Sequence, residues 1–381
     1  MRRALGLAVG LGLIPALLSG CSLSPSPSTP TSGDADWLAG ALTSALAAGD
    51  EATFDSLFSG LTNAGIRGWV WTNLTELKSV TFAALDDGTL QATWRADGNA
   101  LTIDSVVGRI GCNADKSNCT VTDLAPQPGN PAPFWLLQPM EVISLGKVQV
   151  MAPTDDATAT DWLRAAQAAQ QTVTDLPLGQ LRDYWDGTLV IELPADANAL
   201  AQRFGEASAA GYTTIGAVTQ LLSQSRDPGQ SGVAWTQFAA HIIVNPLTTG
   251  SSTPDERLFL ITHEAVHAAT GAWPIVDGAT WVSEGLAESV AMDAVPSQAG
   301  GDIEVAKRVC TADGLAVPTD ADYRSDSASE LGVAYAVGGV VVGLIRAHLG
   351  DAASDALLAL RLGKDAPNVD LPTWTRTWCD S

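Results

Sequence analysis

The spacing of apolar residues separates a short helical start from a strand-rich stretch. Leu38, Leu42 and Leu46 recur every four residues, so residues 36–48 are predicted to form a helix, followed by a second helix at 52–57. From residue 79 the pattern alternates, and it predicts strands at 80–82, 90–94, 101–103, 134–137, 141–144 and 148–151. Asp86-Asp87-Gly88 is typical of a turn between the first two strands.

The second half of the chain combines helices with buried strands. A long helix is predicted at 155–174, where Trp162, Ala166, Ala169 and Val173 form one stripe. Strands are expected at 188–193 and 239–245, with a helix at 196–204 between them. Thr253-Pro254-Asp255-Glu256 supplies an N-cap, a proline at the first helical position and an acid at the third, so a helix begins there and ends near Gly271.

These elements predict an α+β protein of two domains. The first covers residues 34–152, and its helices followed by antiparallel strands resemble the nuclear-transport-factor-2-like and cystatin-like folds. The second covers residues 153–381 and is expected to be mostly helical with a small sheet. The tryptophans of the first domain are interpreted as core or pocket-lining residues rather than as an aromatic cluster that binds a ligand: Trp69, Trp71, Trp94 and Trp135.

The N-terminal segment is typical of an exported protein. Residues 1–20 begin with Arg2 and Arg3, continue through an apolar stretch and end in small residues, as a signal peptide does. Leu18-Ser19-Gly20-Cys21 resembles the lipobox of bacterial lipoproteins, which implies lipidation of Cys21 and anchoring to the outer face of the cell membrane. The alternative is an ordinary signal peptide with an incidental cysteine. Residues 21–33 are rich in serine and proline, as expected of a spacer.

Composition narrows the possible partners. The chain has 381 residues, of which 46% are hydrophobic, so it is long enough to bury a substantial core. Its formal net charge of −22 argues against nucleic acid as a partner.

Four cysteines follow the spacer, an even number that favours disulfides in an exported chain. Of the three possible connectivities, Cys112 with Cys119 and Cys310 with Cys379 keep each pair inside one predicted domain. None of these cysteines forms a Cys-x-x-Cys pair, so zinc binding by them is disfavoured.

The motif His263-Glu264-Ala265-Val266-His267 carries the most chemistry. Residues four apart lie on one face of a helix, so the two imidazoles can bind one zinc ion while Glu264 lies beside it. A catalytic zinc needs a third protein ligand and an open fourth position, and Glu284 can supply that ligand from a second helix that begins near Thr280. Glu288, four residues later, can accept the free ring N–H of a ligand histidine.

Together with Trp281-Val282-Ser283-Glu284-Gly285-Leu286-Ala287, this motif resembles the gluzincin branch of the zincin metallopeptidases. The resemblance implies His263, His267 and Glu284 as zinc ligands, Glu264 as general base and Glu288 as partner of a ligand histidine. The metzincin branch is disfavoured, because its extended motif needs glycine and histidine where this chain has Thr270 and Trp273.

Tyr335 and the two remaining histidines are the other candidates for a role near the site. Tyr335 is the candidate donor to the oxyanion, with a tyrosine packed in an apolar helix as the alternative. His241 has apolar neighbours and is interpreted as a core histidine rather than a pocket residue, and His348 as a surface residue.

The sequence thus predicts a lipid-anchored, extracytoplasmic zinc peptidase acting on a peptide or protein substrate. A different hypothesis is a non-catalytic zinc-binding lipoprotein that captures a ligand or partner at the cell envelope. Glu264 favours the enzyme, because a structural zinc site has no use for an acid at that position. Cleavage specificity and oligomeric state are left open by the sequence.

Overall fold

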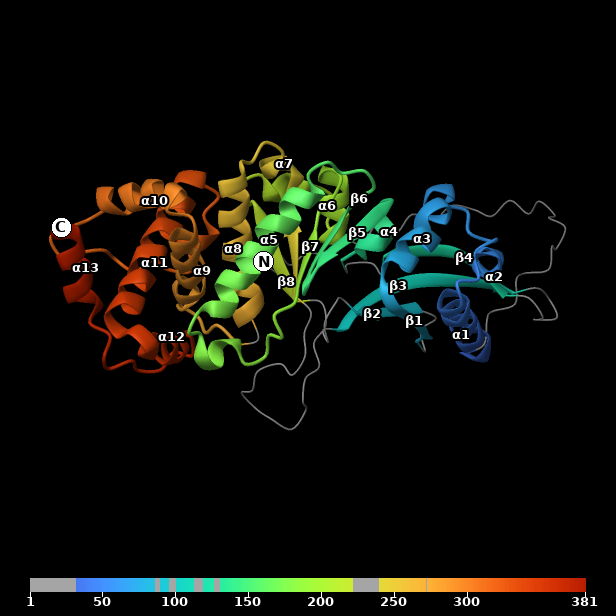
Figure 1. The fold of residues 1–381 in the computed structure, drawn as a ribbon, viewed down its shortest axis with the longest axis horizontal. Helices are drawn as coiled ribbons and strands as arrows, with labels where there is room; N and C mark the ends of the chain where they lie inside the picture. Colours follow the sequence, from blue (N-terminus) through green and yellow to red (C-terminus); the bar gives the residue numbers. More distant parts are fainter. Residues whose placement is uncertain are drawn as a thin grey trace, which may run out of the picture.

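The computed structural model describes residues 32–85, 90–95, 101–112, 119–126, 131–221, 240–271 and 273–381. Figure 1 shows an elongated arrangement with the N-terminal helices and their sheet at one end, a second sheet in the middle and a helical segment at the other end. The fold is therefore mixed, with helices and two sheets, as the sequence predicts.

The N-terminal part consists of three helices on an antiparallel sheet. The helices are α1 (Ser32–Ala48), α2 (Glu51–Leu57) and α3 (Ala64–Glu76). The strands follow one another in the order β1 (Lys78–Ala84), β2 (Leu90–Arg95), β3 (Leu101–Cys112) and β4 (Cys119–Pro126). Cys112 and Cys119 face each other across β3 and β4 and form a disulfide, as predicted.

Two elements of this part, α3 and β4, were not indicated by the sequence pattern, although Ile66, Val70 and Leu74 are buried at helical spacing in α3. The strand predicted at 134–137 is instead the short helix α4 (Phe134–Leu137), which begins after Pro133. A short apolar run does not distinguish a buried strand from a buried helix by its periodicity, and this run is buried at Phe134, Trp135 and Leu136.

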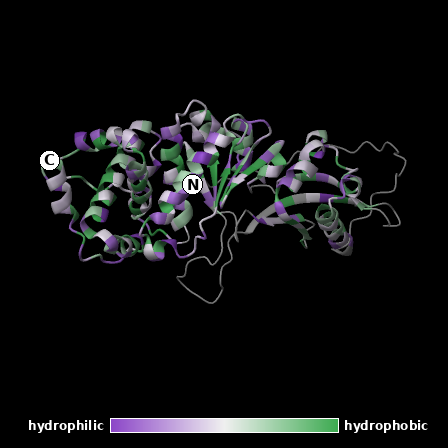
Figure 2. Ribbon diagram, in the orientation of Figure 1, coloured by the Kyte–Doolittle hydropathy of each residue, from purple (hydrophilic) through white to green (hydrophobic). Residues whose placement is uncertain are grey.

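The central sheet has five strands in the order β5, β6, β7, β9, β8. Its members are β5 (Met140–Leu145), β6 (Val148–Pro153), β7 (Leu189–Glu192), β9 (Ala240–Val244) and β8 (Ala217–Leu221). β6, β7 and β9 are parallel, while β5 and β8 run antiparallel at the two edges. Figure 2 shows these central strands as predominantly hydrophobic, consistent with β7 and β9 being buried along their whole length.

The pairing of β6 with β7 crosses the domain boundary predicted between residues 152 and 153. Both β5 and β6 belong to the central sheet and not to the N-terminal one. Parallel strands require a crossover, and α5 (Ala159–Asp175) provides it between β6 and β7. The strand before that helix must therefore lie in the same sheet as the strand after it.

Helices cover both faces of the central sheet. α5 and α8 (Pro254–Thr270) pack together on one face, where the predicted stripe of Trp162, Ala166, Ala169 and Val173 is buried. On the other face α6 (Ala197–Arg203) packs through Leu200 and Ala201 against Ile243. The N-terminal part contributes Asn73, whose side-chain oxygen accepts from Met140 N at 2.9 Å.

The C-terminal segment is helical. Its helices are α9 (Thr280–Ala294), α10 (Pro296–Arg308), α11 (Ala328–Leu349), α12 (Ala353–Arg361) and α13 (Leu371–Asp380). The predicted disulfide Cys310–Cys379 joins the end of α10 to α13. Among the described residues, one stretch, 328–361, is long and apolar enough to cross a membrane, and half of its apolar window is buried inside the protein.

Candidate metal centre

Helix α8 begins with the capping box that the sequence predicts. The Thr253 hydroxyl accepts a hydrogen bond from Glu256 N at 3.3 Å, and the Glu256 carboxylate accepts one from Thr253 N at 2.7 Å. Pro254 occupies the first helical position. These contacts satisfy amide donors that the first turn would otherwise leave free, and they set the helical register in which both histidines face one point.

The two histidines of α8 and Glu284 of α9 converge. Nε2 of His263 and Nε2 of His267 lie 3.2 Å apart, and Oε2 of Glu284 is 3.2 Å from His267 Nε2 and 3.5 Å from His263 Nε2. His263 is 8% exposed, and all three residues line one cavity. The three residues predicted as ligands are therefore brought together by two helices.

This triangle fits one metal ion. A tetrahedral zinc ion with ligand distances of about 2.0–2.1 Å has ligand atoms about 3.3 Å apart. The observed separations of 3.2, 3.2 and 3.5 Å agree with that value without any movement of the side chains. Among the described residues, His263, His267 and Glu284 form the group that could hold a metal ion.

A close crossing of α9 and α11 places Glu284. A Cβ on Gly285 would lie 2.5 Å from the carbonyl oxygen of Gly338 in α11, so only glycine allows the two backbones to approach this far. The start of α9 is held by Asp320, whose carboxylate accepts from Gly278 N at 2.8 Å and Thr280 N at 3.2 Å. The helix does begin at Thr280, but its capping carboxylate comes from a distant loop that the sequence pattern did not indicate.

Glu288 orients the first histidine. Its Oε2 lies 2.9 Å from His263 Nδ1, which places a proton on Nδ1 and leaves Nε2 free to bind a metal. Asp302 of α10 lies near Glu288, and burial together with the charge of Glu288 raises the pKa of Asp302 to about 6. Glu288 is placed as predicted, whereas Asp302 was not found from the sequence.

The ligand side chains stabilise one another electrostatically. Burial favours the neutral form of Glu284, but His267 and His263 outweigh it and hold the pKa of this carboxyl well below its usual range. Burial lowers the pKa of His263, but hydrogen bonds to Glu284 and Glu288 outweigh it and raise that pKa well above its usual value. A cation would take the place of the shared protons, because metal ligands bind in their deprotonated form.

Glu264 lies beside the triangle and is held by the edge strand β8. The Thr219 hydroxyl lies 2.6 Å from Glu264 Oε2 and 3.0 Å from the Glu264 carbonyl oxygen. Glu264 is 6% exposed and lines the same cavity as the histidines. Thr219 was missed because β8 was not predicted, and its five residues, Ala217–Leu221, are too few for a clear pattern of alternation.

Tyr335 also reaches the site. Its ring lies 5.6 Å from the His263 ring and 5.4 Å from the ring of Tyr323, and it lines the cavity over the candidate ligands. Burial, followed by the charge of Glu284, raises the pKa of Tyr335, so the phenol stays protonated and can donate a hydrogen bond.

The cavity over the ligands has a volume of about 510 Å³ and both polar and apolar walls. Ile215 and Val218 lie on the β8 side, and Trp273 and Ile275 lie beyond the end of α8. Arg361, the last residue of α12, completes the lining and had no signal in the sequence. The remaining lining residues are Ala217, Thr219, His263, Glu264, His267, Gly271, Ser283, Glu284 and Tyr335.

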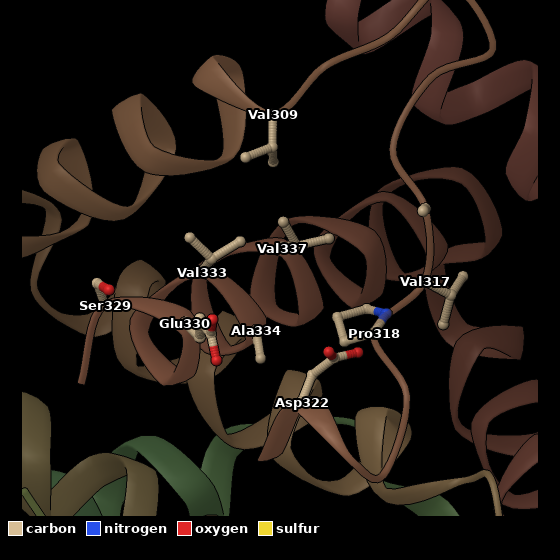
Figure 3. A pocket seen from close by; sticks show the side chains of 10 residues that line it. Val309, Val317, Pro318, Asp322, Ser329, Glu330, Val333, Ala334 and Val337 are labelled. Carbon is tan, nitrogen blue, oxygen red and sulfur yellow. The ribbon is translucent and has the colours of Figure 1, made fainter. Parts of the chain in front are cut away.

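A second cavity, of about 410 Å³, lies between α11 and residues 316–322 (Figure 3). Its walls include Val309, Val333 and Val337, and the two carboxylates of Asp322 and Glu330 also line it. Asp322 already accepts from Thr319, and Glu330 already accepts from Ser325. This cavity offers no group of metal ligands comparable to the triangle.

The other histidines and two of the four tryptophans lie where the sequence indicates. His241 is fully buried, with Nδ1 2.6 Å from Glu192 Oε1, and is a core residue. His348 is exposed and stacks on Trp374 with ring centroids 4.3 Å apart. Trp94 and Trp135 lie in the core. The predicted turn at 86–88 and the predicted leader with Cys21 lie outside the described residues.

Neither models of known protein families nor curated proteins give a match to this chain.

Proposed function

We propose that this protein is a zinc-dependent peptidase whose ligands are His263, His267 and Glu284, as in the gluzincins that its motif resembles. The observation that carries the proposal is the triangle of ligand atoms with an acid, Glu264, beside it in an open cavity. Two imidazoles and one carboxylate are a donor set that zinc favours, and three protein ligands leave one position for a reacting group. A site that only stabilised the fold would fill all four positions.

Zinc bound there would supply Lewis-acid activation of a water molecule and of the scissile carbonyl. Glu264 is placed to accept the proton of the attacking water and to deliver it to the amide nitrogen as the carbon–nitrogen bond breaks. Tyr335 keeps its proton and lies next to His263, so its hydroxyl can donate to the oxyanion that develops on the carbonyl oxygen.

Strand β8 is suited to hold an extended substrate. It is the last strand of the central sheet, and Ala217, Val218 and Thr219 line the cavity that contains Glu264. An edge strand has unpaired backbone donors and acceptors that a peptide can join as an additional strand. This placement favours a peptide over a small ester or amide as the substrate.

The proposal is tested with metal analysis and a matched pair of variants. Purified protein is expected to contain about one zinc per chain and to cleave members of a peptide library. Glu264→Gln should keep the metal and lose at least about 100-fold in kcat, whereas Glu304→Gln, an exposed residue of α10, should behave like the wild type. Equal cleavage by the Glu264→Gln protein would refute the mechanism, and zinc retained by His263→Ala would refute the site.

The same experiment separates the peptidase from a non-catalytic zinc lipoprotein. If the protein is a non-catalytic zinc lipoprotein, both the wild type and Glu264→Gln should bind zinc, and neither should cleave any peptide.

We also propose that the protein is exported and anchored through Cys21. Two disulfides support an oxidising compartment. Cys21→Ser is expected to move the protein from the membrane fraction to the soluble fraction, and an unchanged distribution would contradict the anchor.

A further inference from the structure

Arg361 is a buried cation in the wall of the candidate active site. It is the last residue of α12, lies 77 positions after Glu284 in the sequence and is 3% exposed. It lines the cavity that also contains His267 and Glu284. Arginine is seldom buried to this extent unless its charge is paired.

Two contacts attach the guanidinium to the last residue of α8 and to the loop that follows it. Nη1 donates to the Thr270 hydroxyl at 3.3 Å, and Nη2 donates to the Trp273 carbonyl at 2.8 Å. Thr270 lies three residues after His267, which is less than one helical turn. The cation is therefore held near the metal ligands by the helix that carries two of them.

Most of its hydrogen-bonding capacity is unused. A guanidinium has five N–H donors, and these two contacts leave three of them over. Nε is buried and has no hydrogen-bond partner among the described residues. Burial lowers the pKa of Arg361 to about 10, so the side chain is still charged at neutral pH.

No carboxylate forms a direct ion pair with Arg361 in the part of the chain that the structure describes, although the charge of Glu284 raises the pKa of Arg361 against the effect of burial. Every other charged lining residue of the cavity has an assigned partner or role. Glu284 is a metal ligand, and Glu264 accepts from Thr219. A divalent ion would balance these two carboxylates, and the charge of Arg361 would then make the cavity positive.

We propose that Arg361 binds a carboxylate of the substrate, which makes peptides that present a carboxylate near the cleaved bond the preferred class. This inference rests on the proposed peptidase function. The group recognised is either the C-terminal carboxylate of a short peptide or an aspartate or glutamate side chain. The planar fork of arginine suits both, because it can donate two parallel hydrogen bonds to a carboxylate.

A purely structural role for Arg361 predicts different behaviour. A cation at the C-terminal end of α8 would also stabilise the helix by donating to its last polar groups. In that case loss of Arg361 would weaken binding or cleavage of every substrate equally. A carboxylate-binding role instead makes the loss depend on whether the substrate carries the carboxylate.

The first test needs no variant. Fluorogenic peptides are compared in pairs that differ in one group. In the first arm, a peptide with a free C-terminal carboxylate is compared with its C-terminal carboxamide. In the second arm, glutamate is compared with glutamine at each position in turn. In one arm the carboxylate form should be cleaved with a kcat/KM roughly 10- to 100-fold higher. Which arm responds identifies the source of the carboxylate, and equal values in both arms would overturn the inference.

A binding experiment provides a readout independent of turnover. Zinc-loaded full-length Glu264→Gln protein should bind the carboxylate peptide more tightly than its amide partner in fluorescence anisotropy. Adding Arg361→Gln should abolish that preference, Arg361→Lys should restore part of it, and Arg346→Gln should leave it intact. Arg346 is a suitable control because it pairs with Asp293 and Ser289 away from the cavity.

The outcomes distinguish the two proposals. Cleavage without any preference for a carboxylate refutes the role of Arg361 and leaves the peptidase standing. Carboxylate-selective binding without cleavage refutes the peptidase and supports the role of Arg361. If Arg361→Gln fails to fold, as judged by circular dichroism, the peptide pairs measured on wild type decide the question.

Discussion

Replacing Glu288 with alanine should weaken zinc binding although Glu288 is not itself a ligand. The change removes the carboxylate that lies 2.9 Å from His263 Nδ1. Without that acceptor, the imidazole loses the contact that fixes its rotation, and the tautomer with the proton on Nε2 becomes accessible. That tautomer cannot bind the metal through Nε2.

The expected size follows from the burial of this contact. A hydrogen bond to a charged group contributes about 1.5–3 kcal/mol, and here both partners are buried, with His263 8% and Glu288 6% exposed. The loss corresponds to roughly 10- to 100-fold in the dissociation constant of zinc. Glu288→Gln keeps an oxygen acceptor but no charge, so its effect should be smaller.

The measurement is a competition titration against a chromophoric chelator of known affinity. Asp293→Ala is the matched control, because Asp293 lies on the same helix and its side chain is 68% exposed in a surface ion pair with Arg346. Circular dichroism checks that each variant is folded. An affinity of Glu288→Ala within about twofold of wild type would refute the argument, since the lost hydrogen bond predicts at least a tenfold change.

Three further predictions concern stability. Burial would raise the pKa of Glu192, but Arg203 and His241 together lower it to about 2, against 4.5 for a free glutamate. This depressed pKa stabilises the fold by about 3 kcal/mol above pH 4.5, and the contribution is lost as the pH falls toward 2. The free energy of unfolding of Glu192→Gln, measured in urea, should lack this part of the pH dependence. Removing the Cys310–Cys379 disulfide, which spans 69 residues, should lower the free energy of unfolding by about 4 kcal/mol. Removing Cys112–Cys119, which spans 7 residues, should lower it by about 2 kcal/mol, as measured by urea unfolding of Cys→Ser variants. Gly285→Ala forces α9 away from Gly338, so its midpoint of unfolding should fall by an amount equivalent to about 1–3 kcal/mol, and an unchanged midpoint would contradict the close crossing.

The two candidate histidine ligands were predictable because their spacing is local. Two histidines four apart need only a helix, and the capping box of Thr253 and Glu256 indicates where that helix begins. Glu284 and Glu288 share a face of α9 by the same spacing. The prediction of a strand at 134–137 was wrong because this apolar run has no period that distinguishes a strand from a helix. Its burial comes from neighbours far away in the chain.

The groups around the ligands depend instead on tertiary packing. Thr219 is brought to the site by an edge strand of five residues, and Asp302 by the packing of α10 near α9. Arg361 is brought there by a helix that begins more than sixty positions after Glu284. None of these residues belongs to a pattern with a period, and each lies next to the site only because of the way the central sheet and the C-terminal helices pack. Their roles therefore could not be inferred from spacing.

The chemistry of the site and its selectivity therefore depend on different parts of the fold. The chemistry of a metal centre is set by donor atoms within one or two helices, so it is visible in a short motif. Selectivity is set by the walls, and here the walls come from β8, the loop after α8 and α12. A net charge of −22 works against the approach of an anionic substrate, so a preference for carboxylates must arise locally. Arg361 is the one arginine or lysine lining this cavity in the described part of the chain, and selectivity for a carboxylate should therefore disappear with that side chain while cleavage persists.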